Sequence, residues 1–303
     1  MNDKKIKVLL STYNGANYIK EQIDSILEQT YGNIEIYVRD DGSKDHTLKI
    51  LEEYEKKKLI HLEKGQNAGF IKSFFSLVKN CGDADYFAFC DQDDVWMKDK
   101  IERAIKILEG RDSTKPLLYF SDYEFYDEKM NFVERVKSYK KPPTFRNSLV
   151  DCMSLGFNSV FNRVAWEKMA GNIPDHSCGH DWWTYMLCAG LGEVIYDRQS
   201  TVKYRRHGKS VSPGGMDFVK FQLWRIKKFI VNDYFKNVRL QLREFESLYG
   251  KELSGENQKL LGLFTGERYN LISALKKAFY MKPFRHRIFD EIAIRCMFLI
   301  GKL

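Results

Sequence analysis

The sequence predicts an α/β protein, with a mainly parallel central sheet flanked by helices and a C-terminal helical extension. Over the first 125 residues, short β-branched or aromatic runs alternate with longer segments of helical period. Polar residues gather where the short runs end, and beyond about residue 215 the pattern is helical. The 303 residues, 44% of them hydrophobic, are enough to bury a large core.

Each element follows from the local pattern of apolar and polar residues. Alternating or continuous apolar runs predict strands at 6–10, 34–38, 60–62, 86–90 and 117–121. Apolar residues at helical spacing predict helices at 16–29, around Leu48 to Tyr54, at 71–79, from Val164 and from near Asp181. Ser43 or Asp45 can cap the second of these helices. The strand at 86–90 is apolar throughout, as expected of a strand buried on both faces.

The charge distribution and the cysteine content limit the classes of protein to which the chain can belong. Residues 203–303 carry 21 Lys+Arg against 9 Asp+Glu, a net charge of +12, and residues 1–202 carry 28 against 32, a net charge of −4. The six cysteines form no CxxC pair, so we expect reduced thiols, and no run suits a signal peptide or a membrane span. We therefore expect a cytoplasmic protein.

Three carboxylates stand within four residues directly after the expected strand at 86–90, at Asp91, Asp93 and Asp94. Such carboxylates repel one another unless a cation lies among them. Mg²⁺ or Mn²⁺ takes oxygen ligands and is commonly shared with substrate phosphates, so a metal held with a nucleotide diphosphate fits. The alternative is a solvated turn in which Asp94 or Asp99 caps the next helix.

Two other strand ends carry polar groups that suit a nucleotide. Asp41 follows the second strand, and its carboxylate can accept the ring N–H of uracil or thymine, unless it caps a helix instead. Residues 11–15 follow the first strand, and Tyr13 can stack on a base. Ligands bind at this carboxyl edge in open parallel sheets.

Several segments together resemble the inverting family 2 glycosyltransferases over about residues 5–212. The segments are VLLSTYNGANYIKEQIDSILEQTY, VRDDGSKDHT, GQNAGFIKSFF, FCDQDDVWMKDKI, GHDWW and YRRHGKSVS. The DQDDVW form, with HDWW and the final basic segment, is most similar to bacterial rhamnosyltransferases that assemble surface polysaccharides. The resemblance implies a glycosyltransferase A fold at 1–214, followed by a basic amphipathic helical extension at 215–303.

The same resemblance implies roles for individual residues. Asp41 would meet the pyrimidine, with Ser11 and Tyr13 bordering the base and Asp91 near the ribose or donor sugar. Asp93 would be the principal metal contact, with Asp94 beside it, and the loop with Asn67 and Gly69 would pass near the donor. Asp181 would be the catalytic base that takes the acceptor's proton, although an N-cap for the helix after it is the alternative.

Aromatic and basic residues near Asp181 complete the expected site. Trp182 and Trp183 are candidates for a sugar platform, although at least one of them is a candidate for the core. His207 is expected to ligate the metal or, with Arg205 or Arg206, to hold the diphosphate, and a basic surface loop is the alternative.

An amphipathic helix is expected around residues 218–234, and its extra aromatic residues and lysines predict docking on an anionic membrane surface. Residues 278–303 repeat the pattern with Arg285, Arg287, Arg295 and Lys302. We expect a peripheral protein on the inner face of the plasma membrane, without a nucleic-acid partner.

The predicted reaction is inverting transfer of one sugar, with dTDP-rhamnose as first donor, a UDP-sugar as second, and a lipid-linked glycan as acceptor. A processive synthase would bring membrane spans and QxxRW, which the chain lacks. A nicotinamide oxidoreductase would need GxGxxG after the first strand, where the chain has STYNG. A noncatalytic sugar-nucleotide-binding module remains an alternative.

Overall fold

The first strand is central to the sheet. In the computed structural model, which describes residues 4–208, 234–266 and 268–303, β1 (Ile6–Thr12) runs parallel to both β2 (Ile34–Asp40) and β4 (Tyr86–Cys90). β3 (His61–Lys64) continues the parallel half beside β2. The predicted strands are therefore confirmed here, with β1 and β2 two residues longer at their carboxyl ends.

The other half of the sheet is mixed. β8 (Ser159–Asn162) runs antiparallel to β4 and to β6 (Leu117–Tyr126), which extends five residues beyond its predicted end. β9 (Glu193–Arg205) pairs parallel with β6, and the short β5 (Val95–Trp96) and β7 (Phe132–Arg135) are antiparallel additions. β9 returns the chain to the carboxyl edge where β4 ends.

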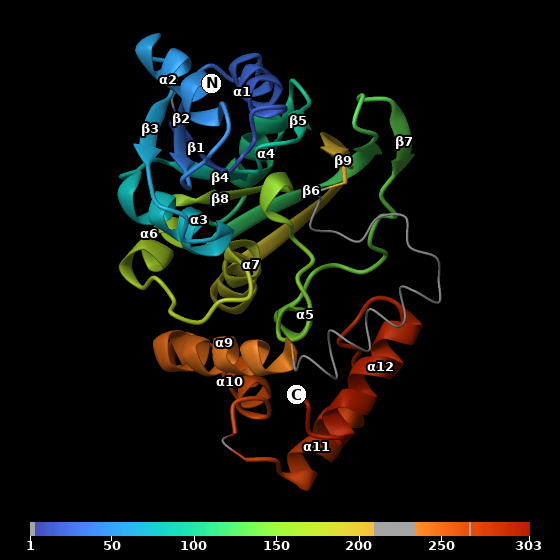
Figure 1. Ribbon diagram of the computed structural model, residues 1–303. Coiled ribbons are helices and arrows are strands. Elements are labelled where there is room, and N and C mark those ends of the chain that lie inside the picture. Colours follow the sequence, from blue (N-terminus) through green and yellow to red (C-terminus); the bar gives the residue numbers. More distant parts are fainter. Residues whose placement is uncertain (1–3, 209–233, 267) are drawn as a thin grey trace.

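Helices cover both faces of the sheet (Figure 1). Because side chains alternate along a strand, Val8 and Leu10 face one apolar cluster with α1 (Ile19–Leu27) and α4 (Lys100–Glu109). Leu9 faces the other cluster, which includes α3 (Phe70–Asn80), α6 (Arg163–Gly171) and α7 (His180–Leu191). α2 (Thr47–Lys56) packs near β3. Of its two proposed caps, only Asp45 accepts a backbone N–H at its start, from Thr47.

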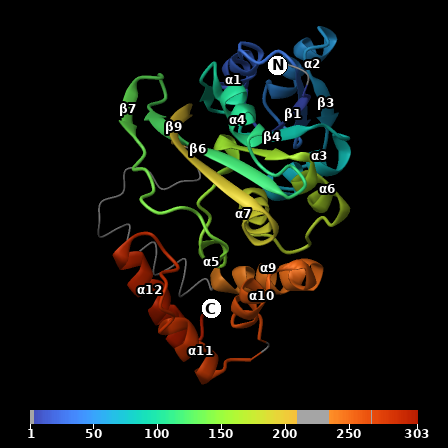
Figure 2. The ribbon, with the colours of Figure 1, turned by 180° about the vertical axis from the view of Figure 1, so that it is seen from behind.

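The C-terminal helices pack on the α7 side of the molecule, as Figures 1 and 2 show. They are α9 (Tyr234–Tyr249), α10 (Gly255–Gly262), α11 (Leu271–Ala278) and α12 (Ile288–Leu299). Apolar residues of α9, α10 and α12 join the same cluster as α3 and α7, so the core is continuous across the expected boundary. That boundary at 214/215, and all but the last residue of the amphipathic helix expected at 218–234, lie outside the described residues.

Trp182 and Trp183 belong to this core. Trp183 is 0% exposed and packs edge-on against Phe245 of α9, and Trp182 donates its indole N–H to the Ser148 carbonyl at 2.6 Å. α7 is covered by the sheet on one side and by α9 on the other, so its aromatic residues are buried all round. The prediction of a tryptophan sugar platform is wrong for both residues.

We expect Trp183→Ala to lower the free energy of unfolding by about 3–5 kcal/mol, because truncating a buried aromatic residue leaves a cavity. Trp183→Phe is the matched control. It should cost much less, because Trp183 Nε1 has no hydrogen-bond partner among the described residues. Urea unfolding of the three proteins gives the comparison, and a similar stability for all three would contradict the packing against α9.

Candidate functional site

Two loops at the carboxyl edge of the sheet are tied together by Gln92. Its side-chain oxygen accepts hydrogen bonds from the Thr12 hydroxyl at 2.6 Å and from the Tyr13 backbone N–H at 2.9 Å. Gly15 permits the close approach, since a Cβ there would lie 2.3 Å from the same oxygen. The nucleotide loop predicted after β1 and the acidic loop after β4 are therefore one rigid unit.

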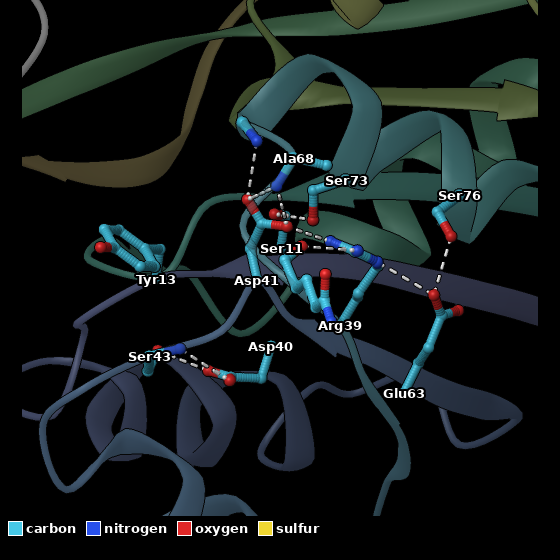
Figure 3. Close-up of polar contacts among 12 residues, drawn as sticks. Ser11, Tyr13, Arg39, Asp40, Asp41, Ser43, Glu63, Ala68, Ser73 and Ser76 are labelled. Carbon is cyan, nitrogen blue, oxygen red and sulfur yellow. Dashed lines mark hydrogen bonds and ion pairs between the residues drawn. The ribbon is translucent and has the colours of Figure 1, made fainter.

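Asp41 lies at the start of α3, where Figure 3 shows it with Ser11 and Tyr13. Its carboxylate accepts the backbone N–H groups of Ala68 at 3.0 Å and Gly69 at 2.9 Å, and it forms an ion pair with Arg39. The side chain is 2% exposed, and these contacts use the lone pairs that a carboxylate offers. Asp41 therefore bonds the two residues that lead into α3 and does not cap the helix that follows it in sequence.

The neighbours of Asp41 differ in their exposure to solvent. The Ser11 hydroxyl lies 2.6 Å from the Ser73 hydroxyl of α3, whereas Tyr13 is 40% exposed and has a face open to solvent. Asn67 is exposed, and its backbone nitrogen packs on Gly42, whose φ of +80° favours glycine. The loop with Asn67 and Gly69 is thus fixed by backbone contacts to the turn after β2.

The acidic residues after β4 share one field of negative charge with Asp181. Burial, together with the charges of Asp93 and Asp181, raises the pKa of Asp91 to about 8. Burial and the charge of Asp93 raise the pKa of Asp94 well above its usual range. Asp93 and Asp181, which are distant in sequence, therefore act on the same carboxyl group at one edge of the sheet.

Asp94 does not cap a helix. One of its oxygens accepts the backbone N–H of Arg205 at 3.1 Å, and the other is buried without a partner among the described residues. Asp99 is the residue before α4, and its side chain makes no capping hydrogen bond. The capping alternative for this acidic segment is wrong.

His207 and Asp93 are in direct contact, with His207 Nε2 2.7 Å from Asp93 Oδ2. The His207 ring stacks on Tyr18 with centroids 4.7 Å apart, which fixes its orientation. No cluster of three or more His, Cys, Asp or Glu side chains arranged for a metal occurs within the described ranges. A carboxylate and an imidazole suit Mn²⁺ or Mg²⁺ where phosphates and water complete the shell, so the pair and the unpartnered Asp94 oxygen fit a substrate-shared ion.

The two arginines predicted to hold a diphosphate both contact other protein groups. Arg205, 4% exposed, donates to the Asp93 carbonyl at 2.9 Å and pairs with Glu21. Arg206 lies 3.4 Å from the centroid of the Phe125 ring and pairs with Glu134. The buried Arg205 guanidinium already has its partners, whereas the diphosphate role of the more exposed Arg206 stays a prediction. Arg205 instead fixes the acidic loop to α1.

Asp181 lies in the first turn of α7. Its Oδ1 accepts the Trp182 N–H at 2.8 Å. Burial raises the pKa of Asp181 to about 6, against the opposing effect of N–H groups from Trp182 and Gly156. The helix begins at His180, one residue earlier, so Asp181 is not the N-cap. A Cβ on Gly179 would lie 2.4 Å from the same oxygen, so glycine is required for this close approach.

Three contributors to this edge could not be predicted from the sequence. Gln92 stands between carboxylates in the sequence, but its contacts with Thr12 and Tyr13 depend on the fold. Gly156 approaches the His180 ring so closely that a Cβ would lie 2.5 Å from its Nε2, and no motif marked it. Lys100 is fully buried, with its pKa lowered to about 7 by burial, although its helical position gave no signal of it.

A groove of about 620 Å³ borders the site between α3 and the segment before α7. Phe70, Phe75 and Pro174 supply apolar walls, and Lys72 and Lys79 line the same space. Its ends reach Gly69, whose N–H binds Asp41, and Ser177, which donates to the Gly179 carbonyl at 2.9 Å.

The family model described as "Glycosyl transferase family 2" matches residues 7–170, which contain β1 to β8 and the acidic loop. The chain belongs to glycosyl transferase family 2. It is 32% identical over 213 residues to the dTDP-rhamnosyl transferase RfbG of Shigella flexneri, covering 65% of this chain and 71% of that protein.

Solved structures show the glycosyltransferase A fold. S. aureus TarS 1-349 in complex with UDP matches with a TM-score of 0.58 and 18% identity, over 92% of this chain and 75% of that one. The mannosyltransferase PcManGT from Pyrobaculum calidifontis, in complex with GDP-Man and Mn²⁺, matches with a TM-score of 0.53 and 16% identity, over 99% and 86% of the two chains. The chain is therefore a family 2 glycosyltransferase with a glycosyltransferase A fold.

The raised pKa of Asp91 gives this transferase a testable pH dependence. The folded pKa of about 8 exceeds the usual 3.8, so the folded state retains a proton that the unfolded state releases. Stability should therefore fall as pH rises from about 4 to about 8 without divalent cations. The free energy of unfolding of Asp91→Asn, relative to that of wild type, should therefore rise by at least about 1 kcal/mol between pH 5 and pH 8. Urea unfolding at both values tests this, and parallel pH profiles would contradict it.

Proposed function

We propose that the chain is an inverting transferase that moves one sugar from a nucleotide diphosphate donor to a hydroxyl of a lipid-linked bacterial surface glycan. The observation that carries the proposal is the shared field of Asp91, Asp93 and Asp181 at the carboxyl edge of the sheet. Direct displacement at a sugar carbon needs a base for the acceptor and charge stabilisation for the leaving group, both at one place.

Asp181 is the proposed base. With a pKa of about 6 it is mostly ionised at neutral pH, and it is more basic than an exposed aspartate. The N–H of Trp182 orients the carboxylate through Oδ1. A positioned base of this kind contributes about 10² to 10⁴ in rate.

Asp93 and His207 are the residues that would hold Mn²⁺ or Mg²⁺, since their side chains already meet at 2.7 Å. The bound ion would supply positive charge to the departing diphosphate. Arg205 supports the site indirectly by donating to the Asp93 carbonyl. The PcManGT complex, which holds GDP-Man and Mn²⁺, supports a metal in this type of site.

The base of the donor is proposed to stack on the exposed face of Tyr13, beside Ser11. Asp41 organises this subsite by fixing the loop with Asn67, and a pyrimidine N–H would bind Asp41 by replacing one of its present contacts. dTDP-rhamnose is the first proposed donor, supported by the similarity to RfbG, and a UDP-sugar is the second, supported by the TarS complex with UDP.

The helical extension is proposed to dock on an anionic membrane, which would bring the site to its lipid-linked acceptor. Large apolar side chains are exposed on α11, α12 and their connection, including Ile272 at 64%, Phe279 at 76%, Met281 at 99% and Phe289 at 81%. Residues 268–303 carry eight Lys or Arg and two Asp or Glu, so the net charge is +6. No helix in the described part of the chain is both long and apolar enough to cross a bilayer. Exposed apolar residues in a segment rich in Lys and Arg suit binding to the surface of an anionic membrane.

We expect Asp181→Asn to lower transfer by about 10² to 10⁴ while donor binding persists, because the amide keeps its shape but cannot take a proton. Purified protein with Mn²⁺ is incubated with a panel of nucleotide sugars and lipid-linked acceptors, and product mass and released diphosphate are read. Donor affinity is measured separately by calorimetry. Donor binding by wild type without transfer to any acceptor would favour the noncatalytic module.

We expect Phe279→Glu with Phe289→Glu to weaken binding to phosphatidylglycerol vesicles by at least about tenfold, because two rings lose their apolar contact and two charges oppose the surface. Phe132→Glu, at a 56% exposed position on β7, is the matched control. Sedimentation of protein with vesicles at low salt measures binding. Equal pelleting of the double variant and the control would refute docking through α11 and α12.

A further inference from the structure

A second cavity, of about 180 Å³, lies away from the acidic edge, where the segment 141–147 meets the connection between α11 and α12. Four of its lining residues carry basic side chains, and none is an Asp or Glu. The lining residues are Lys141, Pro142, Thr144, Arg146, Asn147, Pro283, Arg285 and His286. We name this cavity the basic pocket.

Several buried nitrogen atoms of the basic pocket lack partners. Both ring nitrogens of His286 lack a hydrogen-bond partner within the described residues, and so does Nε of Arg285. The rest of Arg285 is used, since it pairs with Asp151 at 3.0 Å and donates to the Val150 carbonyl. A neutral imidazole carries one N–H, so His286 and Arg285 leave two buried donors without an acceptor at one cavity, which indicates a missing acceptor group.

The cations of the basic pocket are also incompletely balanced. Lys141 and Arg146 form no ion pair with any described residue, and Arg146 uses its Nε to bond the Pro283 carbonyl at 2.8 Å. Burial lowers the pKa of His286, and the charges of Lys141 and Arg146 lower it further. An anion in the pocket would reverse this repulsion and accept the unused hydrogen bonds together.

We propose that the basic pocket binds a phosphate group. Phosphate presents several strong acceptor oxygens, and arginine and lysine recognise it through charge-assisted hydrogen bonds. The pocket joins two parts of the molecule, because Arg146 and Asn147 bond the carbonyls of Pro283 and Phe284 across it. Bound phosphate therefore strengthens the attachment of the α11–α12 connection to the catalytic sheet. The site stands apart from the proposed transfer reaction and does not depend on it.

The phosphate can come from solution or from a lipid headgroup, and both sources present the same chemistry. The position favours access from a membrane, since the exposed Met281 and Phe289 flank the lining segment 283–286. Inorganic phosphate and pyrophosphate are the soluble probes. Phosphatidic acid vesicles are the lipid probe, with phosphatidylcholine vesicles for comparison.

The test follows the His286 imidazole resonances by NMR while each probe is added to the full chain at constant ionic strength. We expect saturable shifts with phosphate, with phosphatidic acid, or with both, and the responding probe identifies the source. Phosphate should raise the thermal unfolding midpoint of the full chain. In the double variant Lys141→Ala with His286→Ala, roughly tenfold more probe should be needed for the same rise. Lys56→Ala, on an exposed helix far from the pocket, is the control.

Two results would overturn the proposal. One is the absence of saturable shifts with every phosphate probe, or shifts that chloride reproduces. The other is an equal phosphate response in the double variant and in the Lys56→Ala control. Because none of these measurements uses a sugar donor, failure of the basic pocket and failure of the transfer reaction are separate outcomes.

Discussion

Mutual repulsion of carboxylates at one sheet edge is the constraint around which this structure is built. Burial and neighbouring negative charge raise the pKa of Asp91 and Asp94, so folding this edge costs free energy without compensating groups. Arg205 supplies one such group, because it donates to the Asp93 carbonyl and its backbone N–H bonds Asp94. β9 must therefore reach the acidic loop, and its thirteen residues end at that contact.

Local sequence pattern was enough to place the candidate residues on one edge. The strand at 86–90 was predicted with the bounds that the structure gives β4, because five consecutive apolar residues suit a strand buried on both faces. Parallel neighbours then bring their carboxyl ends together, which places Ser11, Asp41 and Asp91 at a common edge. The contact between Asp93 and His207 joins residues 114 positions apart, and only their residue types could suggest it.

Side-chain partners from distant elements could not be predicted in the same way. Trp183 and Arg205 both carry groups that suit a ligand, yet α9 covers the first and Glu21 of α1 pairs with the second. A helical lysine is usually exposed, and the burial of Lys100 depends on how α4 packs against the sheet. Periodicity gives the face of an element, but the tertiary neighbour decides whether a polar group meets solvent or protein.

The same dependence on distant elements makes the C-terminal extension part of the site. Glu244 of α9 accepts the backbone N–H groups of Asp175 and His176 at 2.7 and 2.6 Å, and Gln241 accepts that of Cys178 at 2.7 Å. These bonds hold the segment that leads directly into the first turn of α7, where Asp181 lies. α9 therefore holds in place the segment that positions the proposed base. Through these hydrogen bonds, the C-terminal extension is connected to the start of the helix that carries Asp181.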